Sequence, residues 1–203
     1  MADNFNDFET VPNLVSMFLS RADLRGDRPF LGFKHGEEWR TISWAETARR
    51  VAGLAKSLKA MGLKKGDRVM LVSENRPEWC IADLAIMAAG CVTVPTYITN
   101  TERDHQHILD NSQSRAVIVS TAKLAQHLMP AVVRSSECEF VIGMEPLKVT
   151  QRGQQKHHDW ADLVQGTDAD VAVLTDEMAK VGRRELACII YTSGTGGAPR
   201  GVK

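Results

Sequence analysis

Apolar and polar residues follow helical periods at the start of the chain. Between Pro12 and Gly26, apolar residues recur at the three- and four-residue spacing of one helical face. A second helical pattern extends from Ser43 to Gly62, and its first four residues have the Ser-x-x-Glu form of a capping box. This part of the sequence therefore predicts two amphipathic helices, the second capped reciprocally by Ser43 and Glu46.

Farther along, short apolar runs alternate with helical patterns. The apolar runs occupy residues 69–72, 91–95, 116–120 and 140–143. The helical patterns between them occupy residues 78–89, 102–111 and 123–134. Continuous apolar runs are typical of strands buried on both faces, and strands joined by single helices favour right-handed crossovers within one sheet. The predicted fold class is α/β, with a mainly parallel sheet built from βα units and flanked by helices.

The segment 148–184 interrupts this alternation. It starts with polar residues that show no period and continues with a stretch rich in Asp. We expect an exposed excursion within the domain, with one short helix near 160–164. The apolar run 186–191 then predicts that the chain returns to the sheet.

Composition and charge exclude several classes of protein. The 203 residues include 25 basic and 25 acidic side chains, so no overall field attracts nucleic acid, and no such partner is expected. The longest apolar stretch, 84–94, is about half the length of a membrane span, so no transmembrane segment is expected. The acidic N-terminus is unlike a signal peptide, and the four cysteines form no Cys-x-x-Cys pair. We expect the thiols to be reduced. The protein is expected in the cytoplasm, either unattached or peripheral to a membrane.

The residues that suggest chemistry lie at the end of the sequence, in 189–203. A strand pattern leads into Tyr-Thr-Ser-Gly-Thr-Gly-Gly-Ala-Pro-Arg-Gly, where glycines let backbone N–H groups approach a ligand and hydroxyls add donors. Arg200 and Lys203 add positive charge, so the segment describes a cradle for a polyphosphate. It is not a Walker loop, because no Gly-Lys-Ser/Thr follows, and it is not a dinucleotide fingerprint, because no helical pattern follows.

This segment resembles the phosphate-binding motif of the AMP-forming acyl-CoA synthetase, adenylation-domain and luciferase superfamily, Tyr-Thr-Ser-Gly-Thr-Thr-Gly-x-Pro-Lys-Gly. Gly196 replaces the usual second Thr, and Arg200 replaces the usual Lys while keeping the charge. Segments 41–46 and 88–95 are similar to the family's Thr-Tyr-x-Glu and Ala-Gly-x-x-x-x-Pro motifs. Segment 96–109 is most similar to long-chain fatty acyl-CoA synthetases.

The resemblance implies a two-step ligase. A fatty acid carboxylate attacks the α-phosphate of ATP, bound with Mg²⁺, to give an acyl-adenylate and pyrophosphate, and the thiol of coenzyme A then displaces AMP. The residues that would bind the β- and γ-phosphates are Thr192, Ser193, Gly194, Thr195, Gly196, Gly197 and Arg200. The resemblance assigns no catalytic residue and no metal ligand to this chain. Acyl length, oligomeric state and the choice between coenzyme A and a carrier protein stay open.

Family adenylation regions are far longer than the 203 residues of this chain. We therefore interpret residues 1–203 as the N-terminal portion of an adenylation domain, ending after the phosphate loop and inactive as a ligase by itself. The alternative is a stand-alone nucleotide- or partner-binding module without ligase activity. A reading frame that continues past Lys203 into Thr-Glu and Gly-Asp motifs would favour the enzyme.

The remaining candidate residues are interpreted as structural. Two groups of charged or titratable side chains are expected at the surface: the histidines His105, His107, His157 and His158, and the helix carboxylates Asp104 and Asp110. The tryptophans are expected to pack against the core rather than stack on a ligand, and these are Trp39, Trp44, Trp79 and Trp160.

Overall fold

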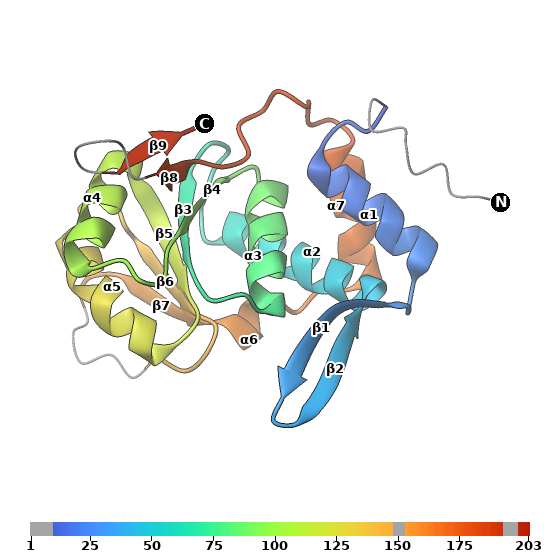
Figure 1. Cartoon of the computed structure of the whole chain (residues 1–203). Coiled ribbons are helices and arrows are strands. Elements are labelled where there is room, and N and C mark those ends of the chain that lie inside the picture. The colour runs from blue at the N-terminus through green and yellow to red at the C-terminus, as the bar shows by residue number, and fades with distance from the viewer. Residues whose placement is uncertain (1–9, 148–152, 193–198) are drawn as a thin grey trace.

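Five parallel strands form the central sheet of the protein, in the order β4-β3-β5-β6-β7 (Figure 1). The computed structural model describes residues 10–147, 153–192 and 199–203. The five strands are β3 (Arg68–Val72), β4 (Val92–Thr96), β5 (Ser114–Val119), β6 (Phe140–Gly143) and β7 (Lys156–Asp159). The predicted α/β class with a parallel sheet is confirmed. The strand order is that of a doubly wound sheet, in which the chain first moves to one side of β3 and then to the other.

Helices cover both faces of the sheet (Figure 1). They include α2 (Trp44–Ala60), α3 (Pro77–Ala88), α4 (Glu102–Ser112) and α5 (Ala122–Arg134). Alternate residues of β3 point to opposite layers: Val69 and Leu71 pack with α2 and α3, whereas Met70 and Val72 pack with α4 and α5. Both faces of β3 are buried, which explains why its sequence is apolar at consecutive positions.

A further layer lies outside α2 and α3 (Figure 1). It contains α1 (Leu14–Arg25), the hairpin of β1 (Pro29–His35) with β2 (Glu38–Ser43), and α7 (Asp168–Met178). Asn13 caps α1 by accepting a hydrogen bond from the backbone of Ser16, and its amide donates to the carbonyl of Met178 at 2.8 Å. The start of α1 is thereby joined to the end of α7. No helix in the described ranges is both long and apolar enough to cross a membrane.

The predicted capping box of α2 is only half correct. Ser43 Oγ accepts a hydrogen bond from the Glu46 N–H at 3.1 Å, as expected. The Glu46 carboxylate, however, accepts from Arg49 and Arg50 one turn later, at 3.0 and 2.7 Å, rather than from the backbone of Ser43. Charge-assisted hydrogen bonds to two guanidinium groups are stronger than one bond to a neutral amide, so the carboxylate turns away.

The segment expected as an exposed excursion, 148–184, is more structured than predicted over its described residues. It supplies the edge strand β7, the short helix α6 (Trp160–Leu163) close to the predicted position, and α7, which packs against α2. Leu174 and Met178 of α7 are buried. The expectation of a single short helix was wrong, because an edge strand needs little apolar sequence and α7 exposes much of its surface.

The apolar run 186–191 returns only to the border of the sheet. The Thr93 N–H of β4 donates to the carbonyl of Ala187 at 3.0 Å, and the Ile189 N–H donates to the carbonyl of Thr93 at 2.9 Å. Beyond this bridge, β8 (Ile190–Thr192) pairs antiparallel with β9 (Arg200–Val202). The run therefore passes along β4 and enters a separate hairpin, which carries the motif found in the sequence.

Candidate functional site

The β8–β9 hairpin carries both ends of the glycine-rich motif. Thr192 at the end of β8 is paired with Arg200 at the start of β9, and both residues are exposed. The other predicted phosphate-binding residues lie outside the described residues, and these are Ser193, Gly194, Thr195, Gly196 and Gly197. The structure therefore locates two of the seven predicted contacts and shows that the two ends of the loop are held side by side.

Close packing inside the hairpin explains one glycine of the motif. A Cβ atom added to Gly201 would lie 2.8 Å from Ile189 Cγ2 and 3.1 Å from Tyr191 Cζ. Both distances are shorter than ordinary van der Waals contacts. The tyrosine ring thus lies directly against the backbone of β9, and a side chain at Gly201 would displace it.

Helix α4 contacts the hairpin at Tyr191 of β8 and at Pro199, just before β9. Tyr191 is buried, and its hydroxyl donates a hydrogen bond to Asn111 Oδ1 at 2.6 Å. Burial raises the pKa of Tyr191, which favours the protonated form that can donate. His107 Nε2 lies 2.8 Å from the carbonyl oxygen of Pro199, and a carbonyl can only accept, so Nε2 carries the proton.

The sequence did not predict these contacts, because it indicated surface positions for the histidines. His107 is half-buried beneath the hairpin, and its ring lies edge-on to Tyr191 with centroids 6.4 Å apart. His107 and Asn111 do show the four-residue spacing of one helical face. The spacing alone could not identify Tyr191 and Pro199 as their partners, since 80 and 92 positions separate the bonded residues.

The surface prediction is wrong for His105. Its side chain is 2% exposed on the inner face of α4, and burial lowers its pKa to about 4. Its Nδ1 atom has no hydrogen-bond partner within the described part of the chain. The imidazole is therefore neutral near pH 7. His157 and His158 are half-buried in β7 rather than in an irregular polar segment.

The two aspartates of α4 have separate structural roles. Asp104 completes a capping box by accepting hydrogen bonds from the hydroxyl and backbone N–H of Thr101, which lower its pKa. Asp110 is exposed and accepts from the Gln106 side chain at 2.9 Å. Across the described residues, no three His, Cys, Asp or Glu side chains gather where they could hold a metal ion.

Three of the four tryptophans pack as predicted. Trp160 is buried, Trp79 packs against the core, and Trp44 stacks on Phe30 with ring centroids 3.6 Å apart. Trp39 in β2 is the exception, because it is 75% exposed. The packing interpretation is therefore wrong for Trp39.

The carboxyl edge of the sheet is a second place where ligands often bind in doubly wound folds. Here the hydroxyl of Ser120, after β5, donates to the carboxylate of Glu74, after β3. Arg76 donates to Glu78 and Glu145, both at 2.8 Å. These groups satisfy one another, so the network stabilises the edge of the sheet and does not extend the candidate site.

An apolar cavity of about 380 Å³ lies elsewhere, between α1, the ends of α3 and α7, and residues 182–187. Leu14, Met87 and Met178 contribute to its walls, together with Lys65 and Glu185, which form an ion pair. Its lining suits an apolar group. None of its lining residues belongs to β8 or β9.

A protein-family model described as AMP-binding enzyme matches residues 18–203, which is most of the chain and includes the hairpin. The chain belongs to the AMP-binding enzyme family. This shows that the resemblance seen in the motif extends over both the sheet and the hairpin.

Relatives of this AMP-binding chain are much longer. Long-chain-fatty-acid–CoA ligase FadD15 of Mycobacterium tuberculosis (strain ATCC 25618 / H37Rv) is 32% identical over 168 residues, which cover 81% of this chain and 26% of FadD15. Long-chain-fatty-acid–CoA ligase ACSBG2 of Mus musculus is 26% identical over 196 residues, covering 96% of this chain and 29% of ACSBG2. The chain thus spans less than a third of the length of these curated relatives.

A solved structure shows the same fold. The crystal structure of the anthranilate CoA ligase AuaEII in complex with anthranoyl-AMP matches with a TM-score of 0.72 and 22% identity. The match covers 95% of this chain and 34% of the AuaEII chain. At this level of identity the comparison establishes the fold of the AMP-binding chain and nothing finer.

Proposed function

We propose that this chain is the N-terminal, nucleotide-binding part of an ATP-dependent, AMP-forming fatty acid–CoA ligase. The observation that carries the proposal is the family match over 18–203, which includes the whole glycine-rich motif. The names of FadD15 and ACSBG2 support a long-chain fatty acid as the carboxylate substrate and coenzyme A as the acceptor. Ligase activity is proposed for the longer protein.

In the proposed first step, a carboxylate oxygen attacks the α-phosphorus of ATP and the bond to the bridging β-phosphate oxygen breaks. Pyrophosphate leaves with additional negative charge, so groups that contact the β- and γ-phosphates lower the barrier. Arg200 would supply positive charge, and Thr192 a hydroxyl donor, at the two ends of the loop. In the second step, the thiol of coenzyme A attacks the acyl carbon, and AMP leaves.

Magnesium enters this proposal only as part of the nucleotide substrate. The described residues offer no cluster of His, Cys, Asp or Glu that fits a resident ion.

Arg200→Ala tests the phosphate role directly. One charge-assisted hydrogen bond to a phosphate contributes about 1.5 to 3 kcal/mol, so titration calorimetry should show ATP binding weakened roughly ten- to a hundredfold. Arg200→Lys should have a smaller effect, because the charge is kept. Arg40→Ala is the matched control, since it removes an exposed strand arginine from the β1–β2 hairpin. An unchanged affinity in Arg200→Ala would contradict the proposed contact.

The 203 residues alone should produce no acyl-CoA above background when mixed with ATP, Mg²⁺, fatty acid and coenzyme A. The reason is that the curated relatives carry more than two thirds of their length outside the matched region. Chromatography of the reaction mixture would measure the product. Turnover by the purified chain would show that the isolated chain contains a complete active site.

A further inference from the structure

Two side chains on one face of α4 hold the β8–β9 hairpin, one at Tyr191 of β8 and the other at Pro199, which directly precedes β9. Asn111 accepts a hydrogen bond from the Tyr191 hydroxyl at 2.6 Å, and His107 donates to the Pro199 carbonyl at 2.8 Å. Tyr191 directly precedes Thr192, and Pro199 directly precedes Arg200. Each hydrogen bond is therefore one residue away from a predicted phosphate contact.

We infer that His107 and Asn111 are positioning residues for nucleotide binding, acting through the hairpin rather than by touching the phosphates. The inference rests on the proposed function of the hairpin. Thr192 and Arg200 are paired with each other, so an anchor on either strand constrains both ends of the loop. Positioning of this kind improves binding because less conformational freedom is lost when the ligand arrives.

Each bond has a defined direction. Tyr191 is buried, and its hydroxyl has one proton, which it donates to Asn111; without that acceptor this hydrogen bond is lost. His107 must carry its proton on Nε2 to reach the carbonyl of Pro199. The edge-on contact between the His107 and Tyr191 rings joins the two anchors into one cluster.

The anchoring helix is itself fixed to the start of the central strand. Arg68 of β3 donates to the carbonyl of Ser112, the last residue of α4, at 2.6 Å and to the carbonyl of Gln113 at 2.9 Å. Gln113 has a left-handed backbone conformation, with φ of 52°. At the end of a helix this conformation is usually adopted by glycine. Arg68 thus satisfies the carbonyl of the last residue of α4 and that of the residue after it.

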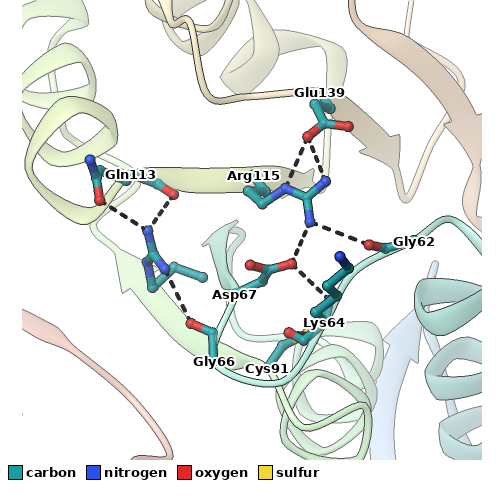
Figure 2. Close-up of polar contacts among 9 residues, drawn as sticks. Gly62, Lys64, Gly66, Asp67, Cys91, Gln113, Arg115 and Glu139 are labelled. Atoms are coloured by element: carbon teal, nitrogen blue, oxygen red, sulfur yellow. Dashed lines mark hydrogen bonds and ion pairs between the residues drawn. The ribbon is translucent and has the colours of Figure 1, made fainter.

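A second polar network lies beside this helix end. Arg115 of β5 donates to Asp67, before β3, and to Glu139, before β6 (Figure 2). Asp67 also accepts from the Lys64 N–H at 2.7 Å. The amino ends of three strands are joined there, so the end of α4 is anchored to a rigid part of the sheet.

The test compares two anchor variants with a conservative replacement. His107→Leu and Asn111→Ala should each weaken ATP binding about two- to tenfold, the loss of one neutral hydrogen bond, in calorimetry with the full chain. They should also speed amide hydrogen exchange at Thr192 and at residues 200–202. His107→Gln should restore both properties, because its amide can donate from nearly the same place. Asp110→Ala, an exposed neighbour on α4, should change neither property.

Two results in the variants would overturn the inference, and a third result, in the wild type, would overturn it together with the proposed function. One is unchanged exchange and unchanged ATP affinity in both anchor variants while Arg200→Ala still weakens binding, which would leave the proposed function intact. The other is that His107→Gln behaves like His107→Leu although both unfold at the same temperature. If exchange responds to the anchors but the wild-type chain binds no ATP, the proposed function fails, and the anchors' role in nucleotide binding fails with it.

Discussion

Gly53→Ala and Gly166→Ala are each expected to lower the free energy of unfolding by about 3 kcal/mol, the upper range for overpacking a closely packed site. A Cβ atom on Gly53 would lie 2.7 Å from the backbone of Gln165 and Gly166. A Cβ atom on Gly166 would lie 1.9 Å from the carbonyl oxygen of Arg49 in α2. The obstructing atoms belong to the main chain, so a side-chain rotation cannot relieve the contact.

Thermal unfolding should show this loss as a decrease in Tm of about 6 to 12 °C, at roughly 2 to 4 °C per kcal/mol for a chain of this size. The sign of the change in stability is informative, because Gly→Ala in a solvent-exposed helix normally stabilises by about 1 kcal/mol. Gly32→Ala is the control, since a Cβ there would meet nothing within 4 Å. A stabilised Gly53→Ala variant would mean that the segment joining α6 to α7 does not pack on α2 as described.

Acidification is expected to destabilise the protein through His105. The folded-state pKa of about 4 lies below the ordinary value of 6.5, so between these values the unfolded chain binds the proton and the folded chain does not. This group's contribution to stability is therefore present above pH 6.5 and is lost as the pH falls toward 4. The shift corresponds to about 3 kcal/mol, at 1.36 kcal/mol per unit.

Urea unfolding between pH 7 and pH 4.5 would measure this effect. His105→Leu should remove the part of the pH dependence that belongs to the imidazole, whatever its effect on stability at neutral pH. His35→Gln, which replaces an exposed histidine in β1, should leave the pH dependence of the wild type unchanged. Parallel stability curves for wild type and His105→Leu would show that the folded protein accommodates a charged imidazole.

Local sequence was sufficient for four of the five strands of the central sheet and for the expectation of a phosphate-binding motif. Strands buried on both faces must be apolar at consecutive positions, as in β3, so the class of fold follows from short runs and the helices between them. The glycines, hydroxyls and Arg200 predict a phosphate-binding motif because they stand next to one another in the chain. Ser43 was correctly predicted as a cap, since its partner is three residues away.

Tertiary structure decided what depends on partners distant in sequence. The polar strand β7 became recognisable only through its pairing with β6. The Glu46 carboxylate accepts hydrogen bonds from Arg49 and Arg50, which the Ser-x-x-Glu motif does not include. The burial of His105 and the bonds from His107 and Asn111 to the hairpin depend on how α4 is placed against its neighbours. Periodicity records which face of a helix is apolar, but it carries no information about which distant residue that face will meet, because such contacts form only when the chain is folded.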